Sequence, residues 1–367
     1  MKEEIELNKL LSYYGRQCIT SYDTVLLVAL GRRLGIFDYL YKANKIVNKD
    51  NRFVTITFTP DEIIRALEFN PKIFDGWLHL AIEFGLLEVD HENKGYLMTA
   101  PHVYELFIDP ESDYYLGYVY GWAYKASSMQ SLIFESFKSG KIIERLDGDI
   151  IEESSRDGNI AGKPAKILRL KLFSTHLKDY HQRLMNGGRL LEIGCAIGTS
   201  LELWAKKYKN THIIGIDLNP NVISILKNAI NNNNWINRVE ALNIALSEYS
   251  KQEKIEKFDV ILLNDVLHEI KDDENYRKNF MEQIYSLLKG DGILIVGETM
   301  MPDIFSIKRG ENFWGSMKKW DEVVFGAKFY DENSFRDFIL STSFKHAELI
   351  KAENDNVGNR YIWAIKK

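Results

Sequence analysis

One segment of the sequence combines residue types that could bind a nucleotide. Between positions 190 and 199, a short apolar run ends at Glu192. The chain then continues through Gly194 and Gly198. Glycine lets the backbone turn tightly and approach a ligand without a side-chain clash, and a helix that follows presents free N–H groups. The next apolar run ends at Asp217, the place from which an acid can hydrogen-bond ribose hydroxyls.

The two acids differ in how well they discriminate between nucleotide ligands. Asp217 is equally expected in a dinucleotide dehydrogenase. Glu192 is not, because a carboxylate just before the glycine turn would repel a pyrophosphate, and the Gly-x-Gly-x-x-Gly pattern is absent. Glu192 instead suits a ligand that carries an amino group and a positive charge. The alternative is an ordinary strand-to-helix turn without a ligand.

A histidine follows a later apolar run, 258–264. At the carboxyl end of a parallel strand, His268 would point into the crevice where ligands bind. Its ordinary pKa near 6.5 lets it accept a proton around neutral pH. His268-Glu269 begins like the zinc motif His-Glu-x-x-His, but position 272 is Asp, so we expect no metal. The alternative role for His268 is packing under the next helix.

From about Gly187, apolar runs that could carry these residues alternate with helical patterns. The run Val260–Leu263 is continuous, as in strands covered on both faces. This alternation predicts an α/β fold with a doubly wound, parallel, seven-stranded sheet. The expected strands are 189–193, 212–217, 239–244, 258–264, 292–298, 347–351 and 360–366. The expected helices are 200–208, 220–230, 273–288 and 332–340.

The first half of the chain is predicted to be mostly helical. Thr59-Pro60-Asp61-Glu62 combines a capping residue, a first-turn proline and a capping-box acid, and Asn70-Pro71 begins a second helix. Two short apolar runs on either side of the polar residues 90–94 predict a hairpin. Two helices and a hairpin form a winged-helix unit. Residues from about 110 to 186 are expected to be a helical connector.

Composition narrows the classes of protein. The chain has 367 residues, a net charge of −5 and two cysteines. A general nucleic-acid binder usually carries a basic surplus, so we expect no nucleic-acid partner. No apolar run reaches the length of a membrane span, and the acidic start is unlike a signal peptide. With too few cysteines for a disulfide framework, a cytoplasmic location fits best.

The segment around Glu192 resembles the first motif of the class I S-adenosylmethionine-dependent methyltransferases, an acid followed by Gly-x-Gly-x-Gly. Here Ala196 stands at the middle glycine. The resemblance implies S-adenosyl-L-methionine as the cofactor and S-adenosyl-L-homocysteine as its product. The glycine turn would contact the methionine part and Asp217 the ribose. The implied cofactor-binding residues are Glu192, Gly194, Gly198, Asp217, Leu218, Asn243, Ile244 and Asn264.

The segment after the fourth strand resembles small-molecule O-methyltransferases of the plant caffeate and bacterial natural-product types. Leu267-His268-Glu269 and Asp272-Asp273-Glu274 correspond to their Leu-His-Asp-Trp-x-Asp-Glu segment. The resemblance implies that His268 removes the proton from an acceptor hydroxyl and that Glu298 orients His268. The family often supplies a second acid from a Gly-x-Glu-Arg-Thr segment. In Gly326-Ala327-Lys328 the corresponding residue is Lys328, so a second acid is not expected there.

The resemblance extends over nearly the whole chain. It implies a winged-helix dimerisation domain over 1–108, a helical connector over 109–186 that contributes to the substrate pocket, and a Rossmann-like catalytic domain over 187–367. The expected partners are a small hydroxylated acceptor and a second copy of the chain, bound through the N-terminal half. No metal is expected.

Other functions are compatible with the sequence. Methyl transfer to nitrogen or carbon would need His268 only for binding. The chain could also bind the cofactor without catalysis. A third possibility is a winged-helix DNA-binding regulator, but its recognition helix, 73–80, contains no Arg or Lys to contact phosphates or guanine.

Overall fold

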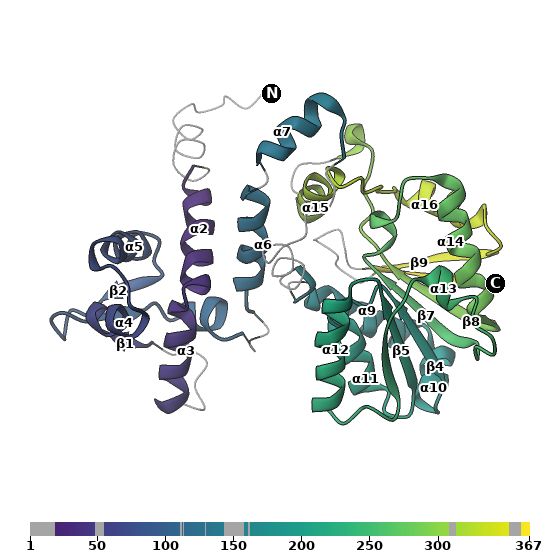
Figure 1. Cartoon of the computed structure of the whole chain (residues 1–367), viewed down its shortest axis with the longest axis horizontal. Helices are drawn as coiled ribbons and strands as arrows, with labels where there is room; N and C mark the ends of the chain where they lie inside the picture. The colour runs from purple at the N-terminus through teal and green to yellow at the C-terminus, as the bar shows by residue number, and fades with distance from the viewer. Residues whose placement is uncertain are drawn as a thin grey trace, which may run out of the picture. The chain divides into compact units, whose positions relative to one another are not determined.

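The structure is a computed structural model, and it describes residues 19–47, 55–110, 112, 114–128, 130–142, 158–160, 162–307, 313–351 and 361–367. These residues form two compact units (Figure 1). The first contains the described residues up to 130 together with 158–160, and the second contains 131–142 and the residues from 162 onward. The connector expected over 109–186 is therefore divided between the two units.

The first unit is helical with one small sheet. Its strands β1 (Thr57–Phe58), β2 (Leu87–Val89) and β3 (Leu97–Thr99) are antiparallel in the order β1-β3-β2. The hairpin β2–β3 follows two helices, as the sequence predicts. The helical elements are α2 (Ile19–Arg33), α3 (Ile36–Val47), α4 (Pro60–Leu67), α5 (Pro71–Glu83), the π-helix η2 (Tyr104–Ile108) and α6 (Gly117–Ser128).

Local signals explain where these helices begin and end. The N–H of Thr59 donates to the Glu62 carboxylate at 2.8 Å, which caps α4, and the Asn70 side chain accepts from two N–H groups at the start of α5. Gly35 has a φ of 79°, a conformation that glycine adopts without strain. It separates α2 from α3.

The second unit is built on a seven-stranded sheet with the order β6-β5-β4-β7-β8-β10-β9. β4, β5, β6, β7 and β8 pair in parallel, and β4 lies between β5 and β7, where the strand order reverses direction. In such sheets ligands bind outside the carboxyl ends of the strands at this reversal. The strands are β4 (Arg189–Ile193), β5 (His212–Asp217), β6 (Val239–Asn243), β7 (Phe258–Asn264), β8 (Leu288–Gly297), β9 (His346–Lys351) and β10 (Tyr361–Lys366).

The expectation of an all-parallel sheet is wrong for the last strand. β10 is antiparallel to both β8 and β9. Only residues 352–360 separate β9 from β10, and a parallel neighbour needs a crossover of a dozen or more residues. The chain therefore returns in the opposite direction and β10 lies between β8 and β9.

Helices cover both faces of this sheet, so the fold is Rossmann-like and doubly wound (Figure 1). One buried cluster includes Phe173, Trp204 and Leu226, which come from α9, α11 and α12. The other includes Met281 and Phe335 from α14 and α16. The helical elements are α7 (Gln130–Ser139), α9 (Lys163–His176), α10 (Lys178–Met185), α11 (Thr199–Lys207), α12 (Pro220–Asn232), α13 (Leu246–Tyr249), η3 (Leu267–Glu269), α14 (Glu274–Leu287), η4 (Ile304–Ser306), α15 (Phe313–Val323) and α16 (Glu332–Leu340).

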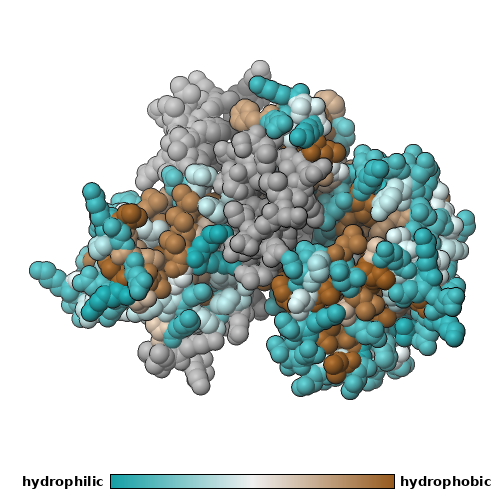
Figure 2. Space-filling view, viewed as in Figure 1, coloured by the Kyte–Doolittle hydropathy of each residue, from teal (hydrophilic) through white to brown (hydrophobic). Residues whose placement is uncertain are grey.

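The surface of the second unit is mixed. Figure 2 shows hydrophilic residues over most of its visible face, with apolar patches between them. Scattered apolar side chains are normal on the surface of a folded protein. Within the described part of the chain, no helix has both the length and the apolar character needed to cross a bilayer.

Candidate active site

The glycine turn predicted from the sequence joins β4 to α11. Gly194 and Gly198 have φ values of 69° and 84°, and Ala196 between them has a φ of 46°. A Cβ at Gly194 would lie 2.5 Å from Cγ2 of Val266, and one at Gly198 would collide with Leu226. Both glycines therefore have a backbone conformation that favours glycine, and a Cβ at either position would force the Val266 or Leu226 side chain to shift. Alanine at position 196 follows the same left-handed course, which is uncommon for a residue with a Cβ.

Asp217 holds this turn in place from the end of β5. Its Oδ2 accepts from the N–H of Ala196 and its Oδ1 from the N–H of Asn219, both at 2.9 Å. The Asn243 amide donates to the backbone carbonyl of Asp217 at 3.0 Å, and so does the N–H of Ile244 at 3.2 Å. The ends of β5 and β6 are thereby fixed beside the glycine turn. Leu218 follows them with an exposed side chain.

Glu192 is buried at the end of β4. Its Oε1 accepts from the Asn264 amide at 3.0 Å, and the same amide reaches Ser200 Oγ at 3.0 Å. Burial raises the pKa of Glu192 above its ordinary value, although the bond from Asn264 and the charge of Lys166 oppose this. The second oxygen, Oε2, has no hydrogen-bond partner among the residues that the structure describes. A buried carboxylate oxygen without a partner is costly, and it suits a ligand that donates hydrogen bonds.

His268 lies on η3, just beyond the end of β7, and is 1% exposed. Its Nδ1 is 2.7 Å from Oε1 of Glu298, whose Oε2 accepts from the backbone N–H of His268 at 3.2 Å. Burial acts to lower the pKa of His268, but the Glu298 carboxylate outweighs it, so this pKa is raised. Within the described part of the chain, Nε2 of His268 has no hydrogen-bond partner. The ring therefore has a fixed orientation and one nitrogen available to a ligand.

The residue against the His268 ring is Phe329, not the Lys328 singled out in the sequence. The two rings stack with centroids 5.3 Å apart. Lys328 donates its backbone N–H to the carbonyl of His268 at 2.9 Å, while its ammonium bonds Asp272 at 2.7 Å. Lys328 thus holds the backbone of the histidine, and an aromatic ring covers the imidazole.

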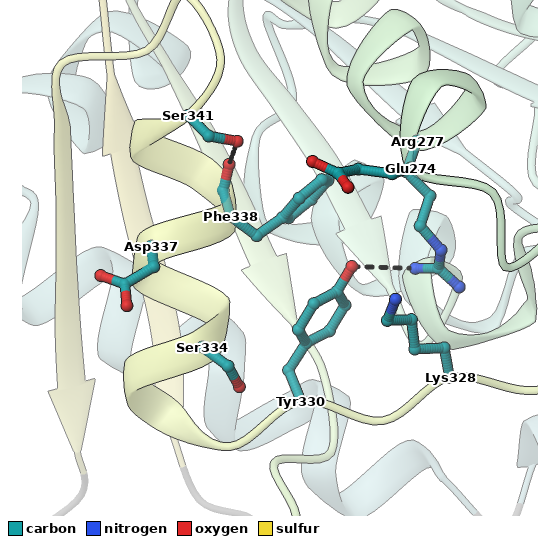
Figure 3. A pocket seen from close by; sticks show the side chains of 8 residues that line it. All are labelled: Glu274, Arg277, Lys328, Tyr330, Ser334, Asp337, Phe338 and Ser341. Atoms are coloured by element: carbon teal, nitrogen blue, oxygen red, sulfur yellow. Dashed lines mark hydrogen bonds between the residues drawn. The ribbon is translucent and has the colours of Figure 1, made fainter.

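A buried arginine fixes the loop that carries His268. The guanidinium of Arg277, on α14, donates to the carbonyls of Leu267, Ile270 and Lys271. It also reaches the hydroxyl of Tyr330 at 3.4 Å, as Figure 3 shows. Arg277 and Tyr330 border a surface pocket of about 360 Å³ between α14 and α16. Because Arg277 is 1% exposed and bound to three carbonyls, it is a support for the loop.

Three charged residues of this region were not singled out from the sequence. Asp265, directly after β7, has a φ of 56° and bonds both Arg169 NH1 at 2.6 Å and Lys318 Nζ at 2.8 Å. Arg169 also contacts the Asn264 amide oxygen at 3.4 Å. Arg169 lies on α9 and Lys318 on α15. Asp265 was within a recognisable motif, but neither cation lies near a motif in the sequence.

These contacts join two of the expected site residues, Glu192 and Asn264, to the charged residues after β7. The Asn264 side chain is hydrogen-bonded to both Glu192 and Arg169. Arg169 is in turn bonded to Asp265. Five buried side-chain polar atoms lack a partner among the described residues, and three of them belong to Glu192, His268 and Arg169. Orphaned polar atoms are rare in folded proteins, so their concentration makes this edge of the sheet the candidate ligand site.

One group of residues has the composition of a metal site. His268, Glu269 and Glu322 each offer a possible ligand atom, all within 4.8 Å of one another. Carboxylates of this kind are common without an ion, and Nδ1 of His268 is bound to Glu298. We assign no metal to this group.

The chain matches a family described as "Methyltransferase domain" over residues 191–294. No curated protein matches it in sequence. Solved structures do match along nearly the whole chain. An O-methyltransferase family protein from Burkholderia thailandensis is 14% identical, with 99% of this chain and 98% of the other covered and a TM-score of 0.69. Human N-acetylserotonin methyltransferase, solved in complex with SAM, is 12% identical, with 100% and 99% covered and a TM-score of 0.69.

A third match is a dimethyltransferase. The N,N-8-amino-8-demethyl-D-riboflavin dimethyltransferase of Streptomyces davawensis is 12% identical, with 99% and 98% covered and a TM-score of 0.69. At these identities the likeness shows the fold. Together with the domain match, it confirms the methyltransferase resemblance at the level of the domain and the fold: residues 191–294 are a methyltransferase domain on a Rossmann-like sheet.

Proposed function

We propose that the protein transfers a methyl group from S-adenosyl-L-methionine to a hydroxyl of a small aromatic or natural-product metabolite, with His268 as the general base. The observation that carries this proposal is the pair His268–Glu298. Glu298 occupies Nδ1 at 2.7 Å, which leaves the buried Nε2 without a partner at the edge of the sheet where Glu192 lies. A general base needs one nitrogen that is held and one that is open to the proton it removes.

The residues at this edge fit the cofactor. The unpartnered Glu192 oxygen suits its amino group, and the backbone of the Gly194–Gly198 turn would contact the methionine part. Asp217 would accept from the ribose hydroxyls, since each of its oxygens has a further lone pair. Leu218, Asn243 and Ile244 follow β5 and β6 and would lie near the adenine, and Asn264 would keep Glu192 in place. When bound, S-adenosylmethionine supplies an electrophilic methyl group.

The chain's own part in the reaction is to position two molecules and move one proton. Nε2 of His268 would take the proton of the acceptor hydroxyl, and Glu298 would stabilise the charge that forms on the imidazole. The raised pKa of His268 makes it a stronger base than a free histidine. Because the sulfonium is intrinsically reactive, most of the acceleration would come from placing the acceptor oxygen in line with the methyl group.

Two measurements test the proposal. Saturating S-adenosylmethionine is expected to raise the melting temperature of the full chain, and a screen of hydroxylated metabolites with radiolabelled S-adenosylmethionine should identify a methylated product. A cofactor that leaves the melting temperature unchanged would contradict the cofactor assignment. Turnover with amines and none with hydroxyls would contradict O-methylation.

Methyl transfer to nitrogen is the second candidate. The observation in its favour is the structural match to the N,N-8-amino-8-demethyl-D-riboflavin dimethyltransferase of Streptomyces davawensis. Matched pairs of phenols and anilines in the same screen separate the two activities. Loss of the His268 imidazole is expected to matter less for an amine, since a neutral amine attacks before it loses its proton.

We further propose a homodimer formed through the N-terminal half, with its winged-helix unit, in the cytoplasm. The side chains of Phe134 and Phe137 on α7 support an interface in the expected connector, because they are 73% and 72% exposed. Large exposed aromatic side chains on one helix are typical of a surface that meets another protein. Light scattering of the purified chain tests this proposal, and a monomer at micromolar concentration would refute it.

A further inference from the structure

A second charged group lies beside the His268–Glu298 pair and has no part in the mechanism above. It consists of Asp265, Arg169 and Lys318. Each oxygen of Asp265 contacts a cation, Oδ2 at 2.6 Å from Arg169 and Oδ1 at 2.8 Å from Lys318. One carboxylate therefore holds two positive charges. The left-handed φ of Asp265, 56°, costs conformational energy and directs the residue away from the strand.

The two cations differ in what they can offer a ligand. Arg169 is nearly enclosed, with a side chain 7% exposed, and it lies against Gly297, where a Cβ would come within 2.5 Å of its Nε. The side chain of Lys318 is 23% exposed. Asp265 takes one of the three N–H donors of its ammonium. Lys318 is thus the cation that a ligand can reach.

Lys318 acts electrostatically on the candidate base and on the acid that holds it. Its charge contributes to lowering the pKa of His268 and of Glu298. Burial acts to lower the pKa of Lys318 itself, but Asp265 and Glu298 outweigh it, and Glu322, one turn later on α15, adds to their effect. The ammonium therefore stays charged at neutral pH. The carboxylates of Glu269 and Glu322 also lie within 4.8 Å of a ring nitrogen of His268, so the positive charge that favours a negatively charged partner is local to the Lys318 ammonium.

Building on the proposed function, we propose that Lys318 binds an anionic group of the acceptor, so that the preferred acceptors are aromatic acids with a carboxylate next to the reacting hydroxyl. The carboxylate would contact the ammonium while the hydroxyl faces Nε2 of His268. The same positive charge would stabilise the oxyanion that forms as the proton leaves. Neutral phenols of equal shape are poorer ligands in this arrangement.

The test uses pairs of probes that differ in charge and hardly in shape: 3-hydroxy-2-naphthoate with 3-hydroxy-2-naphthamide, and salicylate with salicylamide. Binding to the full chain saturated with S-adenosylhomocysteine is measured by calorimetry. The wild type is expected to bind each acid at least about 10-fold more tightly than its amide, which is about 1.4 kcal/mol. Lys318→Gln should reduce this ratio to about 2 or less, and Lys318→Arg should retain most of it.

Lys319→Gln is the matched control, because Lys319 is the next residue on the same helix and makes no contact with Asp265 among the described ion pairs. It should leave the preference unchanged. The proposal is wrong if the wild type does not prefer the acids, if it binds neither acid, or if Lys319→Gln has the same effect as Lys318→Gln. A readout by binding keeps the two proposals distinguishable. An acid that binds through Lys318 but is not methylated supports this inference and contradicts the proposed reaction.

Activity gives a second readout where transfer occurs. Lys318→Gln is expected to raise KM for the acid about 10-fold or more while KM for S-adenosylmethionine stays within about 2-fold. A variant that merely unfolds part of α15 would raise both. An unchanged KM for the acid would contradict the proposal.

Discussion

The two sides of the candidate site are built in different ways. The cofactor side is built around a backbone turn between β4 and α11, which has three residues at positive φ. N–H groups of this turn bond Ile216 and Asp217, and the Glu192 side chain lies beside it. The acceptor side consists of side chains from distant parts of the chain, such as Arg169, Asp265 and Glu298. A backbone site can tolerate changes in exposed side chains. A site made of buried charges depends on every partner, since removing one leaves another uncompensated.

The largest expected effect is on the acceptor side. His268→Ala removes the candidate base and should lower kcat on a hydroxyl acceptor by about 10²- to 10⁴-fold. The affinity for S-adenosylmethionine, measured by calorimetry, should stay within about 2-fold. His346→Ala, at an exposed position on β9, is the control and should change neither quantity. Full turnover by His268→Ala would show that the acceptor side does not supply the general base.

The next effect belongs to the cofactor side. Glu192→Gln keeps the shape of the side chain but removes the charge next to the glycine turn. A hydrogen bond to a charged group contributes about 1.5–3 kcal/mol, so Kd for S-adenosylmethionine should rise by about 10- to 100-fold. Glu202→Gln on α11, where the acid pairs with Lys206 at the surface, is the matched control. An unchanged Kd would show that Glu192 does not contact the cofactor.

A glycine outside the turn tests whether the acceptor side also depends on backbone. Gly297→Ala would place a Cβ against the Arg169 guanidinium, and crowding of this kind costs about 1–3 kcal/mol. We expect a lower melting temperature and a raised KM for the acceptor. Gly290→Ala is the control, because a Cβ there meets no atom within 4 Å. Equal melting temperatures for the two variants would mean that the Arg169 side chain can shift away from residue 297 without a loss of stability.

The smallest effect concerns pH. Glu298 raises the pKa of His268, so the base is protonated, and inactive, up to a higher pH than a free histidine. Activity should therefore rise with pH through a value above 6.5. Glu298→Gln removes the negative charge, so the pKa of His268 should fall and the acidic limb of kcat/KM should move to lower pH. If the acidic limb of kcat/KM stays in place, a group other than His268 causes it.

The fold was largely predictable from the sequence. Helix 332–340 was predicted at its observed bounds, and β4, β5 and β7 also agree. These predictions depend on local patterns of apolar residues and turn residues. The direction of β10 was not predicted, since strand direction is set by the length of the connection and by pairing with β8, neither of which is a local pattern.

The candidate site was predictable on one side only. Residues 192–198 are contiguous, so their joint geometry follows from one turn. Asp265 and Arg169 are 96 positions apart, and Asp265 and Lys318 are 53 apart. Such contacts exist only after α9 and α15 have packed against the sheet. The aromatic ring of Phe329 over His268 has the same origin, and nothing in its local sequence indicates it.

The buried cysteine of the glycine turn has a practical consequence. Cys195 is 4% exposed, and burial raises the pKa of its thiol well above the ordinary value. Alkylating reagents attack the thiolate, so they should modify Cys195 only in molecules whose turn has opened. In a Cys18→Ser variant, the rate of labelling therefore measures how often the turn opens. Protection of Cys195 by a nucleoside would then report occupancy of the turn without any turnover.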